Sequence, residues 1–196
     1  MISKLERYKH PLLACVLCAG AVASYLFGSY AYNANKFFGF PLDDPWIHLQ
    51  FAKNLHDYGS FSYFKNEMVT AGSTSPLYTL LLAVGFFFTS NEMMLSYALG
   101  VVFLLAAALF IFKLTSIQHA EQYGYSGTQK THPSSLNTAH ASSLPLALGI
   151  SLLLLLETRM QWAALSGMET TLFICVLLGV LYFYQAKQSI SFGVAS

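Results

Sequence analysis

Apolar residues are gathered in long blocks along this chain and do not alternate with polar ones. A helix needs roughly 20 apolar residues to cross the hydrocarbon core of a bilayer. Four blocks approach or reach that length, and we predict transmembrane helices at about 11–32, 93–114, 144–158 and 168–186. The first block follows a basic N-terminus, and no small-residue cleavage site follows it. It therefore indicates an uncleaved helix that starts in the cytoplasm.

Three further segments lie between these blocks. Residues 44–58 open with Asp44-Pro45, a favourable helix start, and predict a juxtamembrane helix on the membrane surface. The apolar run 76–88 would be roughly 20 Å long as a helix. That length is short for a crossing and predicts a re-entrant or membrane-dipping helix. Residues 115–143 are rich in Ser, Thr, Gln, Gly and His, which predicts a flexible polar loop.

The basic residues favour one topology over the other. If 76–88 dips in and returns, more basic residues lie inside than outside, as the positive-inside rule requires; a full crossing reverses this majority. The favoured topology places the Asp43 loop and the polar segment around Arg159 on the same, extracytoplasmic face. In that topology the inner set is Lys4, Arg7, Lys9, Lys113, Lys130 and Lys187, and the outer set is Lys36, Lys53, Lys65 and Arg159.

Composition agrees with a membrane protein. The 196 residues are 55% hydrophobic and 10% charged, against about 25% charged in ordinary soluble domains. We therefore expect an all-α integral membrane fold, a multi-pass helical bundle forming one transmembrane domain over 1–196. The net charge of +1 gives no electrostatic reason to expect nucleic-acid binding. The cysteines, which lie in apolar blocks, are interpreted as small hydrophobic residues: Cys15, Cys18 and Cys175.

Asp43 and Asp44 are the first candidates for chemistry. One interpretation is structural, with Asp44 as a helix N-cap and Asp43 as its solvated neighbour. The other is that a carboxylate pair at the membrane boundary accepts a proton from a hydroxyl group or holds a divalent cation against a phosphate. The metal requirement stays open. Among the six histidines only His48 is near enough to Asp44 to assist, and all six are predicted to be non-ligands.

Two further segments carry polar side chains. Ser73, Thr74 and Ser75 precede a proline-started helix; they suit a turn and cap, or a phosphate at the helix N-terminus. Arg159 and Glu169 lie between apolar blocks, where ionisable residues usually pair or serve a site. Arg159 suits either a lipid phosphate or the head-group region. Glu169 suits a base, a metal ligand or a helix cap.

Taken together, these segments resemble the type C (GT-C) membrane glycosyltransferases, and more narrowly the bacterial branch related to arabinofuranosyl- and mannosyltransferases. The resemblance extends from Asp43 to about Tyr184. The T-S-P-L and S-G-M-E-T strings are fairly specific as a pair, whereas a D-D pair alone is not. The matching residues are Asp43, Asp44 and Ile47, then the string from Gly72 to Leu81, then Arg159, Trp162 and the string from Ser166 to Thr170.

The resemblance implies a polyprenyl-phosphate-sugar donor, a glycan or lipid acceptor, and an active site on the outer face of a bacterial inner membrane. It makes Asp43 and Asp44 catalytic candidates, one of them as general base toward the acceptor. Glu169 becomes a further active-site carboxylate and Arg159 a phosphate contact. We add His48, Ser73, Thr74 and Ser75 as candidate substrate-binding residues.

One departure from the family concerns length, because these enzymes are usually much longer than this chain. We therefore expect a fragment or a truncated copy of such an enzyme. The alternative is a non-catalytic membrane subunit that binds lipid phosphates or partner helices. A transporter is disfavoured because the polar residues gather at one interface, whereas transporter sites lie near the bilayer midplane.

Overall fold

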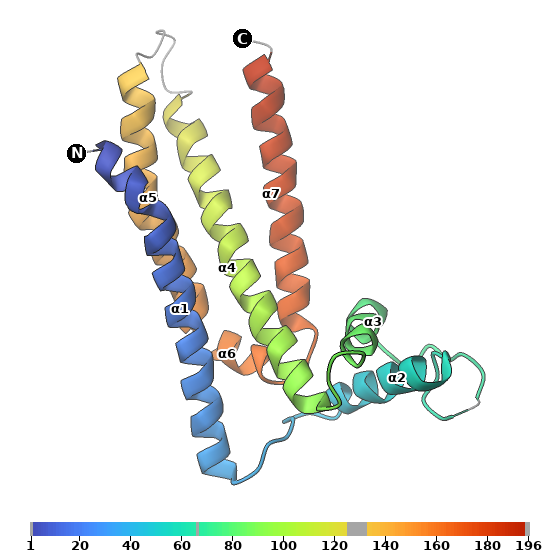
Figure 1. The fold of residues 1–196 in the computed structure, drawn as a ribbon. Coiled ribbons are helices and arrows are strands. Elements are labelled where there is room, and N and C mark those ends of the chain that lie inside the picture. Colours follow the sequence, from blue (N-terminus) through green and yellow to red (C-terminus); the bar gives the residue numbers. More distant parts are fainter. Residues whose placement is uncertain (1, 66, 125–132, 195–196) are drawn as a thin grey trace. The chain divides into compact units, whose positions relative to one another are not determined.

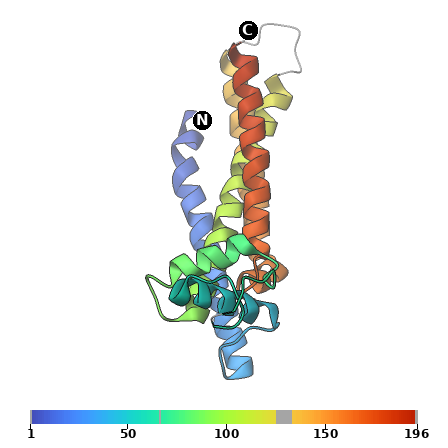
Figure 2. The same cartoon turned by 90° about the vertical axis from the view of Figure 1, so that its right-hand side faces the viewer.

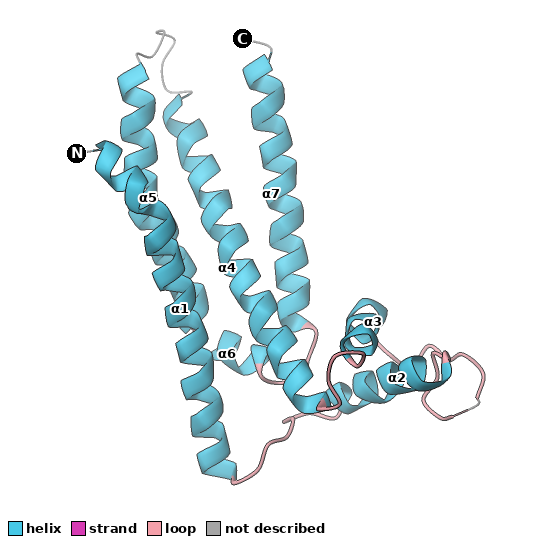
Figure 3. Ribbon diagram, viewed as in Figure 1, coloured by secondary structure: helices cyan, strands magenta, loops and turns pink. Residues whose placement is uncertain are grey.

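The structure is a computed structural model that describes residues 2–65, 67–124 and 133–194, and within these ranges every regular element is a helix (Figures 1 and 3). This confirms the predicted all-helical class. The described helices are α1 (Ile2–Asn35), α2 (Asp44–Tyr58), α3 (Pro76–Gly85), α4 (Glu92–Gly124), α5 (Pro133–Leu156), α6 (Thr158–Ala164) and α7 (Thr170–Val194).

Three stretches are long and apolar enough to cross a membrane: Lys9–Asn35, Glu92–Ile117 and Thr170–Lys187. They agree with three of the four predicted crossings. The fourth predicted crossing, at 144–158, corresponds to Leu144–Leu156, which is helical in the structure. Leu144–Leu156 and Thr158–Ala164 make a span only as a broken pair that bends by 61°. The described chain therefore has the character of an integral membrane protein, with three candidate spans or up to four.

The predicted polar loop at 115–143 is shorter in the structure. Helix α4 continues to Gly124, and α5 begins at Pro133, so helix enters the segment from both sides. Residues 125–132 lie outside the described residues. Local composition was a weak guide here, because Ser, Thr and Gln lower helix stability only by fractions of a kcal/mol and an adjoining helix extends through them.

The chain resolves into two compact units, of which the first comprises residues 1–23, 104–157 and 174–196. Its described core contains Phe112, Leu144 and Ala147. Gly20 of α1 lies directly against the side chain of Leu155, where a Cβ would meet the leucine methyl groups at 2.8 Å. These contacts pack α1, α4 and α5 against one another within this unit.

The second unit comprises residues 24–103 and 158–173 and contains all the segments that carry candidate chemistry. In it α2 and α3 lie side by side, as both views show (Figures 1 and 2). Lys53 of α2 also pairs with Glu92 at the start of α4, with 2.7 Å between Nζ and Oε1. The core between the helices is formed by Leu49, Ala52, Tyr78, Leu82, Ala83 and Leu172.

Helix α3 has two contrasting faces. Tyr78, Thr79, Leu82 and Ala83 are buried. The other face leaves three large apolar side chains about half exposed, and the turn after the helix adds two phenylalanines that are more exposed still. This exposed apolar face consists of Leu77, Leu80, Val84, Phe87 and Phe88.

Candidate functional site

His48 is the centre of a buried polar network in the second unit. Its side chain is 1% exposed. Nδ1 lies 3.0 Å from Oγ of Ser73, and Nε2 lies 3.2 Å from Oε2 of Glu169. The three residues come from the three segments that the sequence analysis selected. Residues that are 25 and 121 positions away from His48 in sequence therefore meet at one imidazole ring.

The network continues on both sides of the ring. Ser73 Oγ lies 2.7 Å from Oγ1 of Thr79, in the first turn of α3, and both residues are buried. On the other side the hydroxyl of Thr74 donates to Oε1 of Glu169 at 3.4 Å. Each oxygen of the Glu169 carboxylate thus has a partner. The Glu169 side chain is nevertheless 24% exposed, so its carboxylate is the end of the network that solvent reaches.

The hydrogen-bonding capacity of each group determines which atom donates and which accepts at each step of the network. An ionised carboxylate only accepts, so His48 donates its Nε2–H to Glu169. In the neutral imidazole Nδ1 is then the acceptor, and it takes the hydroxyl hydrogen of Ser73. The Ser73 oxygen in turn accepts from Thr79. All four side chains are satisfied by this arrangement.

Tyr78 lies against the same ring. Its aromatic ring meets His48 edge-on, with centroids 5.7 Å apart and planes at 86°, and its hydroxyl lies 2.8 Å from Oγ of Ser96. Burial raises the pKa of the Tyr78 phenol to about 12, and the negative charge of Glu169 adds to the increase. Tyr78 is therefore a neutral packing partner for His48 at physiological pH.

Gly167 brings the loop before Glu169 close to the start of α2. It has a positive φ of 79°. A Cβ there would meet the ring of Phe40 at 2.5 Å and Cβ of Pro45 at 2.8 Å. Only glycine combines this backbone conformation with so close an approach. Gly167 belongs to the S-G-M-E-T string, and its φ angle and close contacts explain why a glycine is needed there.

Asp43 and Asp44 lie at the start of α2, one turn before His48. The interpretation of Asp44 as the N-cap is wrong, because the helix begins at Asp44 and Asp43 occupies the cap position. The Asp43 carbonyl accepts the N–H groups of Trp46 and Ile47, whereas no side-chain capping bond forms. Asp43 is exposed and Asp44 half-buried. Within the described residues neither carboxylate has a hydrogen bond or ion pair.

The other predicted site residues are not part of the His48 network. Ser75 is the N-cap of α3 but makes no side-chain capping bond. Arg159 is exposed on α6 and has no polar partner among the described residues. Nor does the described part of the chain bring together three His, Cys, Asp or Glu side chains that could hold a metal ion.

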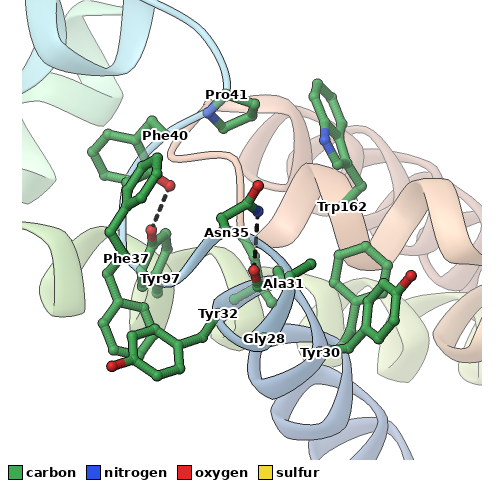
Figure 4. A pocket seen from close by; sticks show the side chains of 15 residues that line it. Gly28, Tyr30, Ala31, Tyr32, Asn35, Phe37, Phe40, Pro41, Tyr97 and Trp162 are labelled. Carbon is green, nitrogen blue, oxygen red and sulfur yellow. Dashed lines mark hydrogen bonds between the residues drawn. The ribbon is translucent and has the colours of Figure 1, made fainter.

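An aromatic cavity that sequence reasoning missed lies in the same unit. It has a volume of about 380 Å³ and lies between the C-terminal end of α1, the segment 36–41, and Trp162 of α6 (Figure 4). The Tyr97 hydroxyl donates to the carbonyl of Gly39 and closes one wall. The aromatic spacing from Tyr30 to Phe40 was the available signal. The main aromatic lining residues are Tyr30, Tyr32, Phe37, Phe40, Tyr97 and Trp162.

Comparison of the chain with protein families, with curated proteins and with solved structures found no match.

Proposed function

We propose that this chain is part of a membrane glycosyltransferase that transfers a sugar from a polyprenyl-phosphate donor to an extracytoplasmic acceptor. One observation carries the proposal. The three segments that resemble the type C glycosyltransferases converge in space, because His48, one turn after Asp44, binds Ser73 and Glu169. The convergence supports the proposal because an active site needs its polar side chains close together.

The unpartnered carboxylates suit the proton transfer. Asp43 or Asp44 accepts the proton of the acceptor hydroxyl while its oxygen attacks the anomeric carbon of the sugar. The bond between that carbon and the phosphate oxygen breaks, and polyprenyl phosphate leaves. Arg159 is exposed and offers the forked hydrogen bonds that stabilise a departing phosphate. Glu169 supplies a second, fixed carboxylate in the same unit.

The aromatic cavity suits the lipid part of the donor. It is lined mostly by apolar side chains and lies at the end of the candidate span Lys9–Asn35. Tyrosine and tryptophan concentrate where a membrane meets water, and ligand pockets are typically apolar with a few polar groups. We assign the first isoprene units of the donor to this cavity. Arg159 lies one helical turn before Trp162, and we assign it to the adjoining phosphate.

We further propose a topology in which α2 lies outside along the bacterial inner membrane and α3 dips into it. The exposed apolar face of α3 supports this, since Leu77, Leu80 and Val84 are each about half exposed. An interfacial helix buries such a face among the acyl chains and keeps its other side in contact with protein. The distribution of Lys and Arg favours the same topology.

Asparagine variants at the aspartate pair test the catalytic assignment. Asp43→Asn and Asp44→Asn keep the size of each side chain but remove the basic oxygen. We expect that in one of them transfer from a polyprenyl-phosphate sugar falls about 10²- to 10⁴-fold, the usual contribution of a general base. Asp57→Asn, on the same helix and paired with His56, is the matched control and should keep wild-type activity. Full transfer in both site variants would contradict the assignment, and donor binding without any transfer in wild type would favour the non-catalytic subunit.

A further inference from the structure

His48 has both ring nitrogens occupied and almost no accessible surface. We propose that His48 is a positioning residue that fixes the orientation of the Glu169 carboxylate and does not itself contact the substrate. The assignment rests on the proposed glycosyltransferase function and replaces the prediction that His48 binds substrate. A side chain that is 1% exposed cannot reach a sugar or a phosphate in solution.

Glu169 needs such a partner because its own backbone does little to orient its side chain. The residue lies just before α7, where its carbonyl accepts the N–H of Phe173. A glutamate side chain rotates about three bonds, and holding it in one rotamer costs about 1–2 kcal/mol of entropy. A charge-assisted bond from His48 to Oε2 and a longer bond from Thr74 to Oε1 offset that cost.

The His48 imidazole is itself held in place by hydrogen bonds and packing contacts on the side away from Glu169. Ser73 and Thr79 are 7% and 0% exposed, and they join the ring to the first turn of α3. Tyr78 packs on the ring edge-on. The chain Thr79–Ser73–His48–Glu169 therefore runs from the buried face of α3 to a partly exposed carboxylate. A functional group held by a rigid supporting shell keeps the geometry that its chemistry needs.

Two substitutions of His48 remove its two hydrogen bonds one at a time. In His48→Gln the amide nitrogen lies near the position of Nε2 and still donates to Glu169, although the bond to Ser73 is lost. In His48→Asn the shorter amide lies near Nδ1 and keeps the bond to Ser73, but it does not reach Glu169. Each variant removes one hydrogen bond from the same buried site. A purely structural role therefore predicts similar losses in both.

A positioning role predicts a difference between the two variants. We expect kcat for transfer to fall about 10- to 100-fold in His48→Asn with KM changed by less than about threefold, as misplacement of an active-site carboxylate would cause. His48→Gln should recover most of kcat. His56→Asn, at the partly exposed histidine of the same helix, is the control and should match wild type. Equal losses in the two His48 variants, or none in either, would overturn the proposal.

A spectroscopic measurement tests the arrangement without relying on activity. NMR of isotope-labelled histidine nitrogens, with His48 assigned by its absence in His48→Asn, should show a proton on Nε2 that is protected from exchange. Glu169→Ala should remove the protection. A proton on Nδ1 alone, or a signal unaffected by Glu169→Ala, would overturn the proposal. If the NMR result is as expected but wild type transfers no sugar, the glycosyltransferase proposal fails while the pairing of His48 with Glu169 stands.

Discussion

At the scale of single residues, the site depends on contacts that are far apart in sequence. The sequence alone was enough to choose Asp44, Ser73 and Glu169 as candidates, because each lies in a recognisable local string. The role of His48 was not predictable in the same way, since its partners are 25 and 121 positions away. Nothing in the residues around His48 indicates that its ring is buried. The N-cap was misplaced by one residue, because Asp43 and Asp44 are equally good caps by composition.

Replacing Gly167 by alanine should lower the stability of the protein. In Gly167→Ala the new methyl group meets Phe40 and Pro45 at less than 3 Å, and φ is 79°. We expect the free energy of unfolding to fall by about 1–3 kcal/mol, from backbone strain and overpacking. Thermal unfolding in lipid nanodiscs measures it. Gly149→Ala is the matched control, because a Cβ there meets nothing within 4 Å. An unchanged melting temperature in Gly167→Ala would show that the close approach does not exist.

At the scale of elements, the apolar blocks were a good guide to where helices occur. The predicted segments at 11–32 and 93–114 lie within helices of the structure, and the segment at 168–186 begins two residues before α7. The polar face of α2 was harder to predict. His48 and Asn54 are buried there because loops supply their partners, with Asn54 donating to the carbonyls of Ser62 and Tyr63. The periodicity of apolar residues predicts which face of a helix is buried. It does not predict which polar residues are buried because they form hydrogen bonds with other segments.

The exposed apolar face of α3 predicts which side chains of this helix contact lipid. Spin labels placed at Leu77, Leu80 and Val84 should collide with oxygen more often than with a water-soluble nickel complex, because these exposed positions face acyl chains in the proposed topology. A label at Glu67, in an exposed stretch of loop, should show the opposite preference. Electron paramagnetic resonance in nanodiscs measures both accessibilities. Labels on α3 that favour the nickel complex would contradict the membrane-dipping position.

At the scale of the whole molecule, sequence and structure agree on a helical membrane protein, with three candidate spans or up to four among the described residues. The break between Leu156 and Thr158 falls at the end of the predicted segment 144–158, where the polar residues around Arg159 begin. The short helix α6 and the 61° bend before it were not predicted, because hydropathy averages over a window and carries no information on chain direction. The aromatic cavity was likewise missed, since it is assembled from Tyr97, Trp162 and the residues that follow α1.

Thermal stabilisation by a lipid-linked sugar tests the proposed donor site. The purified chain in nanodiscs is heated with each of a panel of polyprenyl-phosphate sugars, beside Arg159→Ala and Lys187→Ala, the latter a control at an exposed cation in the first unit. At about 100 times Kd, one donor should raise the Tm of wild type and of Lys187→Ala by about 5–10 °C. The increase should largely disappear in Arg159→Ala. No stabilisation by any donor, or equal stabilisation in all three proteins, would contradict the proposed donor site.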